Sequence, residues 1–163
     1  MRVRKKPWAA QELLDNTLVI NDAPEKKGKW KEYFGNDHPI YVEIGCGKGS
    51  FTVETAAAHP EVLFVAVERV ADCLLLAMEK VMARGLDNVV FVCDDAARLG
   101  EMFAPGEVDR MYINFCDPWP SKKHAKRRLT YEKFLLSYRD FLRDGGGIEF
   151  KTVGFAEIRS RCG

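Results

Sequence analysis

Short apolar runs alternate with longer amphipathic stretches along the chain, and this alternation predicts strands joined by helices. Unbroken apolar runs are typical of strands buried on both faces of a parallel sheet. The predicted strands span residues 40–44, 62–67, 89–93, 108–115 and 148–153. The predicted helices span residues 25–34, 51–59, 71–84, 96–102 and 131–143. The pattern therefore predicts an α/β fold in a single domain, residues 1–163.

A basic arm, residues 1–24, precedes the first helix, and its first eight residues carry four cations beside Trp8. Such an arm is able to contact phosphates, and the alternative is a solvated terminus. Asp22 is the expected N-cap of the helix, with Pro24 in its first turn. In the helix that follows, we expect the aromatic residues to pack on the core and the lysines to face water.

A glycine-rich turn follows the first predicted strand and opens a helix, as in nucleotide-binding βαβ units. Gly45, Gly47 and Gly49 are spaced by two. Glycine is expected because a Cβ would keep a ligand off the turn and because some turn positions need a positive φ. The carboxylate of Glu43 beside the turn favours a cationic ligand over a pyrophosphate, which indicates S-adenosylmethionine. The alternative is a tight turn with no ligand.

Acidic residues follow the next two strands at their carboxyl ends. Glu68, about 20 residues beyond the glycines, is placed to hydrogen-bond the hydroxyls of a ribose. Its alternative role is that of an acid at the start of the following helix. Of Asp94 and Asp95, one is placed to bind an adenine amine and the other to cap the short helix 96–102. Position alone leaves open which acid does which.

A stiff Asp-Pro-Trp-Pro loop, residues 117–120, follows the fourth strand at the edge where open α/β folds carry their chemistry. Cationic side chains crowd the next eight residues. We expect this run to contact phosphates, which would make substrate affinity fall steeply with salt, whereas a run far from such an edge is usually a solvated face. The run comprises Lys122, Lys123, His124, Lys126, Arg127 and Arg128.

Composition narrows the class of protein further. The 25 basic and 24 acidic side chains nearly cancel, so the local clusters carry the information rather than the net charge of +1. No apolar run is long enough to cross a membrane, and the basic amino terminus lacks the apolar core of a secretory signal. The five cysteines show no metal-ligand spacing, so we expect no metal and reduced thiols in a cytoplasmic protein.

Several motifs together resemble the bacterial tRNA (guanine-N7)-methyltransferases of the TrmB type. They are Arg-x-Arg-x-Lys-Pro-Trp near the amino terminus, Glu-Ile-Gly-Cys-Gly-Lys-Gly at 43–49, Val-Glu at 67–68, and Asn-Phe-Cys-Asp-Pro-Trp-Pro at 114–120 with its basic trailer. The likeness runs from residue 2 to about residue 152. The Asp-Pro-Trp-Pro loop with the basic trailer is its most specific part, because many methyltransferases share the glycine turn.

The resemblance implies a Rossmann-like class I methyltransferase fold with a mostly parallel sheet and S-adenosylmethionine as cofactor. It implies methyl transfer to N7 of a tRNA guanosine, expected in the variable loop, by a monomer or homodimer. Glu43, Glu68, Asp95 and Asp117 match the family's cofactor-contacting acids, and Asp117 also matches its catalytic residue. The basic trailer would then bind the tRNA backbone.

The chain departs from the family pattern at its carboxyl end. Ser121 stands where the family has a substrate-contacting lysine, which leaves Lys122 or Lys123 to take its place, and Val153 stands where the family has an aspartate. Residues 153–163 do not resemble the family, so we expect a truncated or frameshifted end that lacks the closing strands and the Thr-x-x-Glu motif. The edge of the fifth strand would then be uncovered.

Three other functions are compatible with parts of the sequence. Asn-Phe-Cys-Asp-Pro-Trp is similar to the Asp/Asn-Pro-Pro-aromatic loops of methyltransferases that act on another base or on a protein amine, but those loops usually lack the basic trailer. A module that binds cofactor or RNA without catalysis would follow from the loss of the carboxyl-terminal motif. A nicotinamide dehydrogenase would share the glycine turn, but Glu43 beside that turn argues against it.

Overall fold

The computed structural model describes residues 7–8, 11–12, 16–115 and 136–152. Their centre is a parallel sheet of five strands in the order β3-β2-β1-β4-β5. The strands are β1 (Ile40–Ile44), β2 (Leu63–Val67), β3 (Val89–Val92), β4 (Val108–Phe115) and β5 (Leu142–Thr152). The first four lie within a residue or two of the predicted ranges, and all the strand pairs are parallel.

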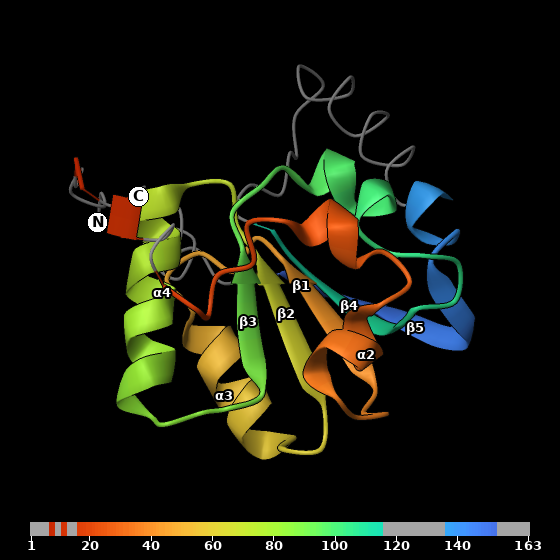
Figure 1. Ribbon diagram of the computed structural model, residues 1–163, viewed down its shortest axis with the longest axis horizontal. Coiled ribbons are helices and arrows are strands. Elements are labelled where there is room, and N and C mark those ends of the chain that lie inside the picture. The colour runs from red at the N-terminus through yellow and green to blue at the C-terminus, as the bar shows by residue number, and fades with distance from the viewer. Residues whose placement is uncertain (1–6, 9–10, 13–15, 116–135, 153–163) are drawn as a thin grey trace.

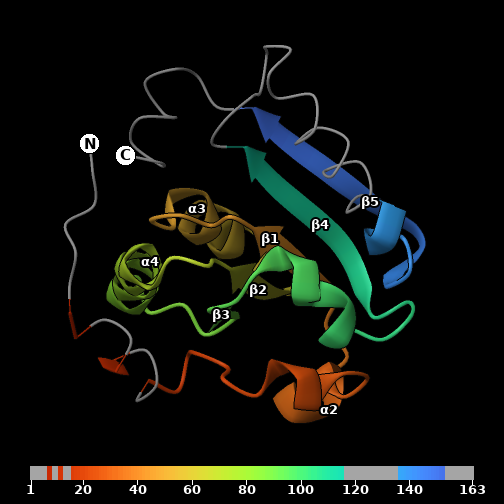
Figure 2. The same cartoon turned by 90° about the horizontal axis from the view of Figure 1, so that it is seen from above.

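Helices cover both faces of this sheet (Figures 1 and 2). One face carries α3 (Ser50–Ala58) and α4 (Ala71–Ala83), whose apolar side chains pack with Phe64 and Phe91. The opposite face carries η1 (Ala23–Lys26), α2 (Trp30–Phe34) and η2 (Ala96–Glu101), which pack with alternate strand residues such as Val42 and Val65. β2 and β3 are buried at every residue, as their unbroken apolar runs predict.

The segment before η1 lies along the outer edge of β3. The Ile20 N–H donates to the Phe91 carbonyl at 2.8 Å, and the Phe91 N–H donates to the Leu18 carbonyl at 2.8 Å. Val19 and Ile20 are buried by this contact. The apolar residues of this segment thus seal one edge of the sheet, which their lack of periodicity did not indicate.

The predicted helix 25–34 is divided into η1 and α2. Gly28 lies between them with φ of 76°. Asp22 occupies the N-cap position of η1 but makes no capping hydrogen bond, and instead forms an ion pair with Lys26 at 3.2 Å. Trp30 is fully buried as predicted, whereas Tyr33 is 48% exposed, so only part of the predicted aromatic face packs on the core.

The predicted helix 131–143 is wrong at its carboxyl end, because Leu142 already belongs to β5. Residues 136–138 are helical, and residues 131–135 lie outside the described part of the chain. Leu142 pairs with Val108 of β4, and the strand register then shifts so that Arg110 pairs with Gly147. Gly145, at φ of 82°, lies in this irregular stretch. The fifth strand therefore starts well before its predicted start at residue 148.

Candidate functional site

The glycine turn lies directly after β1, at the carboxyl edge of the sheet. Gly45, Gly47 and Gly49 have φ values of 74°, 56° and 84°, a region that side chains with a Cβ rarely adopt. The predicted need for positive φ is confirmed at all three glycines. The turn reverses the chain sharply between β1 and α3.

Two of these glycines are also needed for close packing within the protein. A Cβ on Gly49 would lie 2.6 Å from the Cβ of Ala77, because α3 and α4 approach each other closely there. A Cβ on Gly45 would lie 3.3 Å from the backbone oxygen of Asn114 in β4. Close packing is therefore a further reason for glycine in this turn, beside ligand approach and positive φ.

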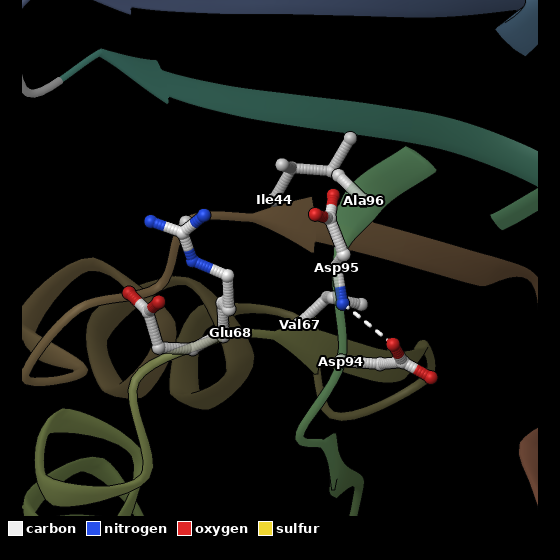
Figure 3. Close-up of a pocket in the computed structure, with 8 residues that line it drawn as sticks. Ile44, Val67, Glu68, Asp94, Asp95 and Ala96 are labelled. Carbon is white, nitrogen blue, oxygen red and sulfur yellow. Dashed lines mark hydrogen bonds between the residues drawn. The ribbon is translucent and has the colours of Figure 1, made fainter. Parts of the chain in front are cut away.

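A pocket of about 180 Å³ opens at the carboxyl ends of β1, β2 and β3 (Figure 3). It lies beside the glycine turn, and Gly45 forms part of its wall. The other residues that line it are Ile44, Val67, Glu68, Arg69, Asp94, Asp95 and Ala96. The structure thus brings together, in one pocket, the acids that follow β2 and β3 and a glycine of the turn.

The carboxylate of Glu68 joins the glycine turn to the start of α4. Its Oε1 accepts a hydrogen bond from the Gly47 N–H at 3.1 Å, and its Oε2 accepts one from the Val70 N–H at 3.1 Å. Val70 is the N-cap residue of α4, so the alternative role as an acid at the helix start is also fulfilled. Each carboxylate oxygen retains a further lone pair with which it can accept from a ligand hydroxyl.

The structure assigns the capping role between the two aspartates. Asp95 is the N-cap of η2, and its Oδ1 accepts from the Ala97 N–H at 2.9 Å. Asp94 instead accepts from the Asp95 N–H at 2.7 Å and forms an ion pair with Arg98 at 2.8 Å. In Figure 3 the Asp95 carboxylate points toward the side of Ile44, whereas that of Asp94 turns away.

Glu43 lies beneath the turn rather than in the pocket. It is fully buried, and its Oε1 accepts a hydrogen bond from the Thr52 hydroxyl of α3. Its Oε2 accepts from the Asn114 Nδ2 of β4 at 2.5 Å. This carboxylate therefore links β1, α3 and β4, and it has no exposed surface.

Asn114 and Thr52 are site residues that the sequence reasoning did not single out as such. Asn114 is a polar side chain between the apolar Ile113 and Phe115 at the end of β4, which was a usable signal. Thr52 carried no signal, because a threonine on a helix is common. Both become noticeable only through the buried carboxylate to which they donate.

Among the described residues, the cysteines Cys46, Cys73 and Cys93 are not activated nucleophiles. Burial raises the pKa of the Cys46 thiol well above its usual value, and the charges of Glu43 and Glu68 raise it further. The thiols of Cys73 and Cys93 also have raised pKa values, again mainly through burial. These thiols therefore stay protonated at neutral pH, which does not suit covalent catalysis.

The chain is similar in sequence to known methyltransferases. Residues 37–157 match the Methyltransf_4 family, described as "Putative methyltransferase". The tRNA (guanine-N(7)-)-methyltransferase of Staphylococcus carnosus is 48% identical over 152 residues, which cover 93% of this chain and 72% of that protein. The enzyme of the same name from Enterococcus faecalis is 46% identical, with 93% and 72% covered.

The chain belongs to the bacterial tRNA (guanine-N(7)-)-methyltransferase family.

Solved structures support the methyltransferase fold. TrmN from Thermus thermophilus superimposes with a TM-score of 0.58 at 27% identity, covering 76% of this chain and 36% of that one. The aminoglycoside resistance methyltransferase NpmB1 superimposes with a TM-score of 0.57 at 21% identity, covering 82% and 66%. The second likeness shows the fold alone. The predicted α/β, Rossmann-like methyltransferase fold is confirmed.

The remaining candidate residues of this family member lie outside the described part of the chain. They are the predicted catalytic Asp117 and the basic run Lys122, Lys123, His124, Lys126, Arg127 and Arg128. The atypical tail, residues 153–163, also lies outside it. Their roles stay predictions. Within the described ranges, no group of three or more His, Cys, Asp or Glu side chains is arranged to hold a metal ion.

Proposed function

We propose that this chain transfers a methyl group from S-adenosylmethionine to N7 of a guanosine in tRNA. The observation that carries the proposal is the 48% identity to a tRNA (guanine-N(7)-)-methyltransferase across 93% of the chain. The pocket supports it independently, because acids from two strands and a glycine of the turn line one cavity at the carboxyl edge of a parallel sheet.

The pocket residues fit the nucleoside part of this cofactor. Glu68 retains acceptor capacity on both oxygens and is suited to the ribose hydroxyls. Asp95 uses one oxygen as a cap, so the other is suited to the adenine amine. The absence of a side chain on Gly45 lets a ligand lie against the end of β1.

When bound, S-adenosylmethionine supplies an electrophilic methyl group on a positively charged sulfur. Guanine N7 carries a free lone pair, so the chain does not need a base to remove a proton before the attack. The work of the protein is to position the nucleophile and to exclude water. We assign Asp117 the role of orienting the guanine, or of stabilising the cationic purine that methylation creates.

The proposed partner is tRNA, held by its backbone through the basic run, with the variable loop presenting the guanosine. We propose a monomer or homodimer in the cytoplasm. Among the described residues, no helix has the length and apolar character needed to span a membrane.

The test is transfer of labelled methyl from S-adenosylmethionine to an unmodified tRNA transcript, with the label mapped to a nucleotide. The expected result is label on N7 of a variable-loop guanosine. Asp117→Ala should lower transfer by about 100-fold or more while changing cofactor affinity only a few-fold. The matched control is Asp144→Ala, which removes an exposed acid from the irregular part of β5.

Other outcomes would point elsewhere. Label on a different base or on a protein amine would replace tRNA N7 as the substrate. Cofactor binding without transfer, beside an active relative, would favour a binding module without catalysis. Equal loss of transfer and of cofactor binding in Asp117→Ala would make Asp117 a cofactor ligand only.

A further inference from the structure

An unpartnered acceptor lies at the carboxyl end of β4, close to the glycine turn. The amide of Asn114 donates from Nδ2 to Glu43, but its Oδ1 is buried and has no hydrogen-bond partner among the described residues. Asn114 as a whole is only 7% exposed, so bulk water does not solvate this oxygen freely. Buried acceptors nearly always have a hydrogen-bond donor, so the Asn114 Oδ1 is a candidate to accept a hydrogen bond from a ligand.

The orientation of this amide is fixed by the charge beside it. An ionised carboxylate only accepts hydrogen bonds, so the Asn114 NH₂ group must face Glu43 and the Oδ1 must face away. The negative charge of Glu43 also polarises the amide and increases the electron density on its oxygen. Such an oxygen favours a positively charged donor over a neutral one.

The strand order places this oxygen at one end of the proposed cofactor path. Asp95 follows β3, Glu68 follows β2 and Gly45 follows β1. If adenine lies at Asp95 and ribose at Glu68, the 5′ side of the nucleoside continues across β1 toward β4. Asn114 is on that next strand, with its backbone oxygen 3.3 Å from the position of a Cβ on Gly45.

We propose that Asn114 Oδ1 accepts a hydrogen bond from the α-ammonium group of S-adenosylmethionine and so positions the methyl-donor end of the cofactor. The proposal rests on the proposed function for the identity of the ligand. Because this oxygen is buried, binding includes a local rearrangement that admits the ammonium group. Glu43 then acts at a distance, by holding and polarising the amide that touches the ligand.

Two variants separate this role from simple support of Glu43. Asn114→Leu is close in size and removes both the donor to Glu43 and the free oxygen. Thr52→Val also removes one donor to Glu43 but leaves the Asn114 oxygen in place. Both variants therefore remove one hydrogen-bond donor from Glu43, but only Asn114→Leu also removes the Oδ1 acceptor.

The measurement is calorimetric affinity, without RNA, for two ligands. One is S-adenosylmethionine, and the other is 5′-methylthioadenosine, which has the nucleoside but no ammonium group. Asn114→Leu should weaken S-adenosylmethionine binding by about 10- to 100-fold and change 5′-methylthioadenosine binding less than about two-fold. Thr52→Val should change the two affinities by similar factors.

Equal weakening of both ligands in Asn114→Leu would overturn the proposal, as would an unchanged affinity for S-adenosylmethionine. A weakening confined to S-adenosylmethionine in Thr52→Val as well would also overturn it. If Asn114→Leu does not fold, Asn114→Asp decides the question. In its protonated form the introduced carboxyl group would donate to Glu43 and keep an acceptor oxygen. The preference for S-adenosylmethionine over 5′-methylthioadenosine should therefore survive at mildly acidic pH, and its loss there would overturn the proposal.

These results are independent of methyl transfer. Wild-type chain that binds S-adenosylmethionine more tightly than 5′-methylthioadenosine, but labels no tRNA, would leave the role of Asn114 open to the same test. In that case the proposed tRNA substrate is wrong, and the affinities of the variants alone decide whether Asn114 contacts the cofactor.

Discussion

Three carboxylates surround the glycine turn, and each uses its oxygens differently. The two carboxylate oxygens of Glu43 accept hydrogen bonds, one from Thr52 and one from Asn114. Glu68 connects the turn to α4 through two backbone N–H groups. Asp95 caps η2 with one oxygen. Structural and ligand-binding roles are therefore combined in single side chains, and variants must separate them.

Asp95 offers such a separation. Asp95→Ala should lower the free energy of unfolding by about 1 kcal/mol, because the Ala97 N–H is left without its cap. It should also weaken S-adenosylmethionine binding. Asp95→Ser restores a capping oxygen but is too short to reach a ligand amine, so it should recover the stability and not the affinity. Urea unfolding and calorimetry check the two effects, and recovery of both by serine would contradict a direct contact.

Gly49 provides a second residue-level prediction. Gly49→Ala places a Cβ 2.6 Å from the Cβ of Ala77 at a positive φ, so it should destabilise the chain by about 2–5 kcal/mol. Gly85→Ala is the matched control, because φ is also positive there but no atom lies within 4 Å. The control should cost only about 1–2 kcal/mol. Equal urea midpoints for the two variants would show that the helix contact is unimportant.

Because of the buried Tyr138, we expect the folded chain to lose stability at alkaline pH. Burial raises the pKa of Tyr138 to about 12, and the charge of Asp95 adds to the effect. Because the folded-state pKa lies above that of an unfolded tyrosine, the contribution to stability is complete below about pH 10 and is lost as pH rises toward about 12. Tyr138→Phe should therefore lose less stability over this window than wild type. Tyr33→Phe, at a 48% exposed position, should follow wild type in the same urea titrations.

At the scale of elements, a single asparagine fixes the exit of α3. Asn88 Nδ2 lies 3.0 Å from the carbonyl oxygens of both Ala56 and His59 and 3.1 Å from that of Val62. These carbonyls come from the last turn of α3 and the approach to β2. The side chain thereby satisfies acceptors that a helix end otherwise leaves without a donor.

This contact predicts an unusual difference between two substitutions. Asn88→Ala should destabilise by about 1–3 kcal/mol, and Asn88→Asp should be worse, because a carboxylate would then face carbonyl oxygens. Asn36 is the matched control, since its Oδ1 accepts from the His38 N–H at 3.0 Å. Asn36→Asp keeps that acceptor and should be nearly neutral. Thermal unfolding of the four variants, with Asn36→Ala included, checks the order.

The elements differ in how far the sequence could predict them. The apolar runs of β1 to β4 and the positive φ at the glycine turn were predictable, because local residues determine them. The start of β5 was not, because Leu142 joins the sheet through pairing with Val108, which is distant in the sequence. The apolar spacing of Tyr138 and Phe141 suits a helix and a buried turn equally well. Gly28 similarly divides the predicted first helix.

The site shows the same limit. Strand ends predicted the pocket acids Glu68, Asp94 and Asp95, since parallel strands bring their carboxyl ends to one edge. The choice between the two aspartates needed the direction of the Asp95 side chain toward the Ala97 N–H. The burial of Glu43 could not be predicted, because it depends on hydrogen-bond donors from α3 and β4, Thr52 and Asn114, whose positions do not follow from spacing in the sequence.

For the whole molecule, the pocket residues and the basic run are separate in the sequence, and we expect salt to affect cofactor binding and tRNA binding differently. Affinity for tRNA should fall steeply with salt concentration, whereas affinity for 5′-methylthioadenosine, an uncharged nucleoside, should not. Replacing Lys126, Arg127 and Arg128 with alanine should reduce the log–log salt slope by roughly 0.7–0.9 for each phosphate that the chain no longer neutralises. Filter binding over a range of salt concentrations measures the slope.

The control for this prediction replaces three lysines near the amino terminus, far from the basic run in the sequence. Lys27, Lys29 and Lys31 are exposed on α2 and the segment before it, and we expect them to face water. Their replacement with alanine removes the same charge, and the salt slope should stay unchanged. An equal change of slope in both triple variants would mean that the net charge, rather than the basic run, attracts the RNA.

All the residues that line the pocket lie between Ile44 and Ala96, in one continuous part of the chain. A chain that grows from its amino terminus therefore contains every pocket residue before Asp117 is joined. The strands β1, β2 and β3, and Val19, which bridges to Phe91 of β3, have all been synthesised by that stage. The residues of the proposed nucleoside pocket are thus complete during synthesis before the residues proposed to bind RNA are joined.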